Sequence, residues 1–196
     1  MKLKFLAIVL VSLFVGCAYA QPSGSGEPTA AGMWEQIYPD GRVGGWFLIF
    51  QHNDVYEGAI AKMFLKPGDN PNPICTHCVG DQKNQPTLGL VIIKGMQRDG
   101  LVYQNGSILD PRDGNVYHAK LTLSADGQKL IVRGYLGIEL LGQNQVWKRL
   151  PNDVLPLDQM PANLVPFWLT LSKPQDGMTG SGPSQTGSIK SWHLRH

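Results

Sequence analysis

Residues 99–127 read DGLVYQNGSILDPRDGNVYHAKLTLSADG, and this stretch decides the fold. It begins and ends with an Asp-Gly pair and contains a third pair at residues 113–114. Asp-Gly tolerates the positive φ angles of tight hairpin turns. In residues 116–123 apolar side chains alternate with His118, Lys120 and Thr122, as in a strand with one buried face. The stretch therefore predicts strands joined by tight turns in an antiparallel meander.

Short runs rich in aromatic and β-branched residues continue this pattern on both sides. They predict eight strands, at residues 33–37, 45–51, 55–64, 88–96, 101–109, 116–123, 130–135 and 144–150. A flat sheet of that size leaves two strand edges unpaired, and closing it into a barrel removes both. The 23 Gly and 14 Pro among 196 residues also favour turns over long helices. We therefore predict an all-β fold, an antiparallel barrel of about eight strands with a proline-rich C-terminal extension.

The first twenty residues are typical of a cleaved secretory signal. Lys2 and Lys4 precede an apolar run, and the segment ends in the small-x-small pattern Ala-Tyr-Ala at residues 18–20. Cleavage after this pattern predicts an exported protein, periplasmic or secreted, that begins at Gln21. A lipoprotein leader with Cys17 as the lipidated residue is the alternative. No later stretch reaches the length of about 20 apolar residues that a membrane-spanning helix needs.

The net charge of the exported chain limits the classes of partner that it can bind. Two of the 17 Lys and Arg lie in the leader, so the remaining 15 equal the 15 Asp and Glu. A chain with no net charge and no basic stripe lacks the electrostatic footprint of a nucleic-acid-binding protein. We expect no nucleic acid partner.

Segments outside the predicted barrel, residues 32–150, differ from it in composition. Residues 21–31 are rich in Gly, Ser, Pro and Thr and predict a flexible linker, and residues 172–196 predict a disordered tail. In residues 151–171 a proline recurs every five positions, which disfavours a regular helix and removes donors for a sheet. We predict that this segment is an extended strap, with residues 167–169 covering an apolar patch outside the barrel. The alternative is that residues 151–171 bind a protein partner in a polyproline conformation.

The motif Cys75-Thr76-His77-Cys78 contains both cysteines of the exported chain. A c-type haem motif needs His directly after the second Cys, where Val79 stands, and a structural zinc site needs two more ligands at suitable spacing. An oxidising compartment favours a disulfide between Cys75 and Cys78 that pins a surface loop. A thiol oxidoreductase pair is the alternative reading. We expect no metal site, no cofactor and no catalytic residue elsewhere, because no recognised catalytic motif occurs.

Gly32 and Trp34 open the first predicted strand, and Arg149 closes the last. First and last strands are neighbours in a closed barrel, so the guanidinium of Arg149 can cover the Trp34 indole by cation–π attraction and donate to backbone carbonyls. This pattern resembles the barrel-closing signature of the lipocalin and fatty-acid-binding superfamily. Residues 73–96, 106–117, 132–137 and 147–149 together resemble the bacterial family catalogued as domain of unknown function 2147. That resemblance covers roughly residues 31–150 and implies a small exported protein with a lipocalin-like barrel, for which the family offers no settled activity.

These observations predict a binding protein rather than an enzyme. Small barrels can hold one ligand, so we expect a small, largely apolar molecule inside this one. The candidate lumen residues come from apolar runs and one alternating strand: Trp46, Leu48, Phe50, Val91, Ile93, Tyr117 and Leu121. The alternative is a barrel filled by its own side chains that acts as a protein-interaction module of the cell envelope. A cavity of at least about 300 Å³ with an apolar lining favours the ligand-binding hypothesis.

Overall fold

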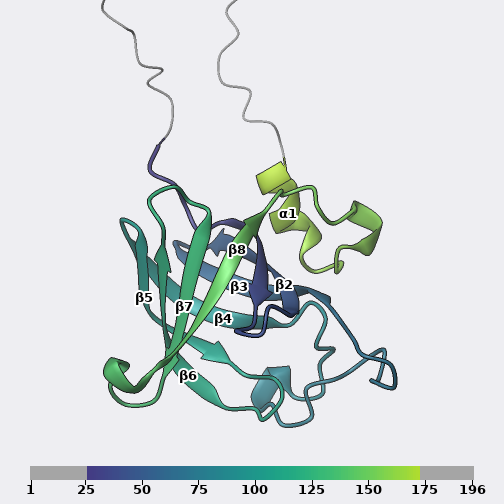
Figure 1. Ribbon diagram of the computed structural model, residues 1–196. Helices are drawn as coiled ribbons and strands as arrows, with labels where there is room; N and C mark the ends of the chain where they lie inside the picture. The colour runs from purple at the N-terminus through teal and green to yellow at the C-terminus, as the bar shows by residue number, and fades with distance from the viewer. Residues whose placement is uncertain (1–25, 173–196) are drawn as a thin grey trace, which may run out of the picture.

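The structure is a computed structural model that describes residues 26–172, and its centre is a closed antiparallel β-barrel (Figure 1). The all-β fold expected from the sequence is confirmed. The eight strands are β1 (Gly32–Ile37), β2 (Val43–His52), β3 (Val55–Met63), β4 (Val91–Asp99), β5 (Val102–Leu109), β6 (Val116–Leu123), β7 (Lys129–Tyr135) and β8 (Gln143–Leu150). The helical segments are three short 3-10 turns, η1 (Gly80–Gln82), η2 (Glu139–Leu141) and η3 (Leu157–Gln159), and one α-helix, α1 (Val165–Ser172).

Each strand pairs with the next along the chain, and β1 pairs with β8 to close the barrel. The closing register places Trp34 opposite Arg149. Strand β4 begins at Val91, later than the predicted residue 88. The preceding backbone turns away at Gly89, whose φ of +85° is in the left-handed region that favours glycine.

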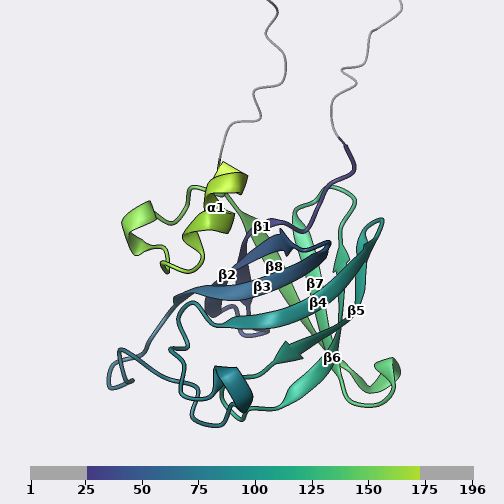
Figure 2. The same ribbon diagram turned by 180° about the vertical axis from the view of Figure 1, so that it is seen from behind.

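Turns of two kinds define the two ends of the barrel. At one end the β2–β3, β4–β5 and β6–β7 connections are tight. At the other end lie the β1–β2, β3–β4, β5–β6 and β7–β8 loops; Figures 1 and 2 show the β3–β4 and β7–β8 loops toward the bottom. Within residues 26–172, the glycines of the four Asp-Gly pairs, Gly41, Gly100, Gly114 and Gly127, have positive φ, as expected of tight turns. The β2–β3 turn instead uses Asn53 and Asp54, both with positive φ.

Two separate apolar clusters lie on the two faces of the barrel wall. The inner cluster fills the lumen near the tight-turn end and includes Trp34, Tyr103 and Leu121. The outer cluster lies between β2, β3 and the segment that follows β8. That segment contributes three buried side chains, Leu155, Met160 and Leu164. Strand β2 is apolar on both faces because it separates these two clusters.

The C-terminal segment does cover an apolar patch outside the barrel, beside β1 and β2 (Figure 2). The ring of Phe167 stacks on Phe50, with 4.0 Å between ring centroids. The indole of Trp168 donates a hydrogen bond to the carbonyl of Asn152 over 2.7 Å. The prediction that the prolines prevent a helix was wrong for residues 165–172. Pro166 lies in the first turn of α1, where no intrahelical partner for its missing N–H is required.

The linker prediction also needs correction at its C-terminal end. Ala30 is fully buried, because its backbone N–H donates to the Tyr103 hydroxyl over 2.8 Å and its carbonyl accepts the Trp34 indole N–H over 2.8 Å. The proposed leader and most of the tail lie outside the described residues. Within residues 26–172, no helix is long and apolar enough to cross a membrane.

Candidate ligand-binding cavity

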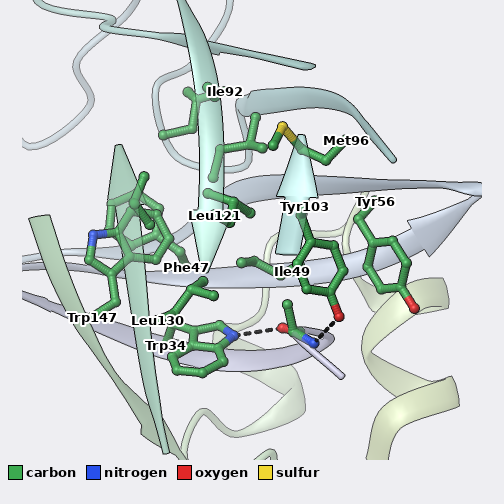
Figure 3. Close-up of a cluster of buried hydrophobic side chains, with 14 of the residues drawn as sticks. Trp34, Phe47, Ile49, Tyr56, Ile92, Met96, Tyr103, Leu121, Leu130 and Trp147 are labelled. Carbon is green, nitrogen blue, oxygen red and sulfur yellow. Dashed lines mark hydrogen bonds between the residues drawn. The ribbon is translucent and has the colours of Figure 1, made fainter. Parts of the chain in front are cut away.

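The tight-turn end of the barrel is sealed by Trp34 and Arg149. The guanidinium carbon of Arg149 lies 4.2 Å from the centroid of the Trp34 ring. Its nitrogens donate to three backbone carbonyls at 2.5 to 2.9 Å, those of Gly127, Ala31 and Thr29. Arginine presents a planar fork of donors, so one side chain can join three chain segments. Trp34 and Tyr103 are both hydrogen-bonded to the backbone of Ala30. Figure 3 shows these two side chains with the lumen residues packed around them.

Gly32 makes room for this seal. A Cβ atom at position 32 would lie 2.5 Å from Nη1 of Arg149, closer than real Cβ atoms approach other atoms. Its φ of +138° is also unfavourable for other residues. Gly32, Trp34 and Arg149 therefore form one structural unit at this end of the barrel.

A cavity of about 1320 Å³ occupies the other half of the barrel and opens among the loops. Its deep wall is apolar, with Phe47, Ile60, Ile92, Val132 and Trp147 from five different strands. The rings of Phe47 and Trp147 stack with centroids 4.2 Å apart. This arrangement provides a chamber with an apolar deep wall that opens among the loops.

A polar pair lies between the apolar wall and the opening. Gln36 on β1 is the one polar side chain that is buried among residues 26–172, with 9% of its surface exposed. Its Nε2 donates to Oε1 of Gln145 on β8 over 2.6 Å. The same Oε1 accepts the indole N–H of Trp147 over 3.3 Å. Both glutamines line the cavity; Gln36 is buried, whereas Gln145 is exposed.

Two arginines at the opening are already paired with carboxylates. Arg42 bonds Asp40 over 2.7 Å in the β1–β2 turn, and Arg112 bonds Asp110 over 2.5 Å in the β5–β6 turn. The hydrogen bond from each arginine holds the pKa of its aspartate below the ordinary value. Both aspartates therefore remain ionised at neutral pH and neutralise the guanidinium beside them.

The Cys75–Cys78 motif braces one side of the opening. The two cysteines form a disulfide with Cα atoms 5.4 Å apart, and both are buried. They pack against the β5–β6 turn, where a Cβ at Gly114 would collide with the backbone carbonyl of His77. Pro111 of the same turn lines the cavity. The disulfide thus holds the β3–β4 loop against the turn that forms part of the cavity wall. Among the described residues, no cluster of His, Cys, Asp and Glu is arranged to hold a metal.

The predicted ligand-binding residues divide into three groups. Tyr117 lines the cavity. Ile93 and Leu121 lie in the inner cluster beneath it, and neither reaches its surface. A third group was expected in the lumen but lies on the outer face of the wall, beneath or beside the C-terminal segment: Trp46, Leu48, Phe50 and Val91.

The physical reason for this correction is the periodicity of a strand. Successive side chains point to opposite faces, so a register error of one residue moves the whole apolar set to the wrong side. Where both faces are apolar, the sequence does not distinguish the two registers. In β2 the lumen residues are Phe47 and Ile49.

Gln36 and Gln145 were missed, although the sequence carried a signal for them. Each stands two residues from a tryptophan, Trp34 and Trp147, and therefore on the same face of its strand. A polar residue in phase with buried aromatic residues is the pattern that marks a polar group inside a barrel.

The fold and the cavity together define a lipocalin-like barrel that is sealed at one end and open at the other. Residues 32–149 match the family described as "Uncharacterized protein conserved in bacteria (DUF2147)", and the chain belongs to that family.

Among solved structures, the chain is similar to one titled "Protein HP1028 from the human pathogen Helicobacter pylori belongs to the lipocalin family". The match has a TM-score of 0.58 and 15% sequence identity, and it covers 74% of this chain and 99% of that one. At this identity the likeness concerns the fold. The comparison with curated proteins found no match.

Proposed function

We propose that this protein is an exported binding protein that holds one small, largely apolar molecule inside the barrel. The cavity carries the proposal. Its volume of about 1320 Å³ is well above the lower size of ligand sites, about 300 Å³, and its deep wall is built from aliphatic and aromatic side chains. An apolar molecule that enters this chamber leaves water and gains the hydrophobic free energy of transfer.

Two features argue against the alternative of a filled barrel that works as an interaction module. Side chains fill the sealed half of the lumen but leave the open half empty. Three apolar side chains of the C-terminal segment, Leu155, Met160 and Leu164, are already buried against the barrel, while Leu157 and Leu169 are exposed.

The oxidoreductase alternative has less support than the binding function. Cys75 and Cys78 are both buried, whereas a reactive thiol needs to be accessible to its partner. Their position at the rim favours a structural role that keeps the opening in shape.

A cavity-filling substitution tests the binding function. Val132 on β7 lines the cavity, and Val132→Phe places a larger ring there. Val146→Phe is the matched control, because Val146 lies on the neighbouring strand and is 46% exposed. We expect the neutral dye N-phenyl-1-naphthylamine to fluoresce on binding the wild type and Val146→Phe, and Val132→Phe to bind it at least about tenfold more weakly, a loss of about 1.4 kcal/mol.

Failure of the dye to bind the wild type would overturn the proposed function. Equal binding by Val132→Phe and the wild type would show that the dye binds elsewhere and would remove the support that the cavity provides. Native mass spectrometry of protein purified from its own source, followed by denaturing extraction, then identifies the natural ligand.

Export is the second part of the proposal, and the leader supports it. The expected mature N-terminus is Gln21, and intact-mass measurement of the purified protein tests this. A diacylglyceryl group on Cys17 would establish the lipoprotein alternative instead.

A further inference from the structure

The orientation of the Gln145 amide is set by its neighbours. Its Oε1 accepts two hydrogen bonds, from the indole N–H of Trp147 and from Nε2 of Gln36. An indole N–H can only donate, so the atom of Gln145 that faces it must be the oxygen. Because that oxygen can only accept, the atom of Gln36 that faces it must be the NH₂ nitrogen. The orientation of the Gln36 amide is therefore determined as well.

This arrangement leaves one acceptor and one donor group for a ligand. Within residues 26–172, Oε1 of Gln36 accepts no hydrogen bond from another group. Nε2 of Gln145 likewise donates no hydrogen bond to another group of these residues. Gln36 is nine-tenths buried and lines the cavity, its free oxygen is not among the fully buried unpaired atoms, and Gln145 is exposed, so water can reach both free groups. A ligand that supplies both a donor and an acceptor would replace the water that these two groups otherwise bind, whereas a purely apolar ligand would displace that water without replacing its hydrogen bonds.

The backbone next to Gln36 is shaped to accommodate its free oxygen. Gly44, in the bulged part of β2, also lines the cavity. A Cβ atom there would collide with Oε1 of Gln36. The glycine therefore leaves room for the amide in the cavity wall.

Most of the cations that line the cavity already contact other groups of the protein. Arg42 and Arg112 are each paired with an aspartate two residues earlier. Lys62 contributes to the cavity lining, and its Nζ lies 4.6 Å from the ring centroid of Trp46, which packs against the outer cluster, so this cation is engaged by an indole outside the lumen. Lys66 also lines the cavity, but it is exposed and belongs to the β3–β4 loop, whereas the two glutamines are on β1 and β8.

We propose that the Gln36–Gln145 pair recognises an uncharged polar group that both donates and accepts hydrogen bonds, of the amide or lactam type, carried by an apolar body. The ligand N–H donates to Oε1 of Gln36, and the ligand carbonyl accepts from Nε2 of Gln145. The apolar body occupies the chamber lined by Phe47 and Ile92. This inference rests on the proposed binding function and names the chemistry of its ligand.

Two isosteric probes isolate the hydrogen bond to Gln36. Decanamide and 2-undecanone share a nine-carbon alkyl chain and a carbonyl, and they differ in an NH₂ group against a methyl group. Their affinities for the wild type and for Gln36→Met are measured by displacement of N-phenyl-1-naphthylamine. Gln143→Met is the matched control, because Gln143 also lines the cavity, at its outer part on β8.

We expect Gln36→Met to lower the ratio of decanamide affinity to 2-undecanone affinity by about tenfold, the factor that corresponds to one hydrogen bond. Gln143→Met should leave that ratio unchanged. Decanoate should bind the wild type more weakly than decanamide, because its carboxylate offers no donor to Gln36.

Dye binding by Gln36→Met shows that the variant is folded with its cavity open. If the dye binds but the ratio does not change, or if decanoate binds more tightly than decanamide, the inference is wrong and the proposed function stands. If the dye does not bind the wild type, both fail. If Gln36→Met itself does not bind the dye, Gln36→Leu takes its place in the same measurement.

Discussion

The seal made by Trp34 and Arg149 leads to a quantitative prediction about stability. Trp34→Ala removes a fully buried indole and should cost about 3–5 kcal/mol of unfolding free energy. Arg149→Ala leaves three backbone carbonyls without donors. A buried acceptor left unpaired costs about 1–3 kcal/mol, and water reaches part of this rim, so we expect a total of about 3 kcal/mol.

The two residues should not act independently. They are opposite one another in the β1–β8 register, and the guanidinium lies 4.2 Å from the indole ring centroid. Once either side chain is removed, the other has already lost part of its contact. The double variant should therefore cost less than the sum of the single variants, with a coupling of about 0.5–3 kcal/mol.

Urea denaturation followed by far-ultraviolet circular dichroism measures these free energies without relying on tryptophan fluorescence. Arg133→Ala is the matched control: Arg133 also donates to backbone carbonyls, those of Glu139 and Leu140, but at the exposed β7–β8 loop. Trp34→Ala and Arg133→Ala should add to within about 0.3–0.5 kcal/mol. If the stability losses of Trp34→Ala and Arg149→Ala also add within this margin, the argument that the two residues form one unit is refuted. Arg149→Lys should recover little, because an ammonium group cannot hold three carbonyls in a planar fork.

Three further predictions concern other parts of the chain. Replacing Cys75 and Cys78 with Ser should leave the barrel folded by circular dichroism, at a cost near the lower end of about 0–5 kcal/mol since the ring they close is short; a marked loss of disulfide-exchange activity would instead support the oxidoreductase reading. Leu155→Ala should lower the unfolding free energy by about 2–5 kcal/mol in urea titrations, and a change below about 0.5 kcal/mol would mean that the C-terminal segment does not share the cooperative core. The Arg112 hydrogen bond lowers the folded-state pKa of Asp110, so the stabilisation is present above the unfolded-state pKa and lost as the pH falls through the folded-state value. Asp110→Asn should therefore be less stable than the wild type at neutral pH by at most about 1 kcal/mol, with the difference shrinking progressively as the pH falls below about 4; a difference independent of pH would contradict this reasoning.

Local patterns were sufficient to predict the barrel. Alternation in residues 116–123 and the Asp-Gly turns depend on the side-chain period of a strand and on backbone angles at glycine, which neighbouring residues impose. A flat sheet of eight strands has two unpaired edges, and closure into a barrel is the arrangement that removes them. The pairing of Trp34 with Arg149 followed from closure alone, since closure makes the first and last strands neighbours.

The same local reasoning failed for the orientation of β2 and for the C-terminal segment. In residues 46–50 every side chain is apolar, so periodicity carries no information about which face is inside. The outer face of β2 is apolar because Phe167 and its neighbours cover it. Phe167 stacks on Phe50, a residue more than a hundred positions away in the chain. Proline spacing likewise did not reveal that Pro166 would fall in the first turn of a helix, where it is tolerated.

Sequence by itself determined the class of fold, the strand order and the seal at one end, because these depend on backbone preferences and on neighbours along the chain. Tertiary structure decided which side chains face the lumen, that the open half of the barrel holds a cavity, and that Gln36 meets Gln145 inside it. These two glutamines come together only when β1 and β8 close the barrel, since they are 109 residues apart in the chain. The candidate binding site is therefore a product of closure, and the physical reason is that a cavity is the volume that packed side chains leave unfilled, which depends on all eight strands at once.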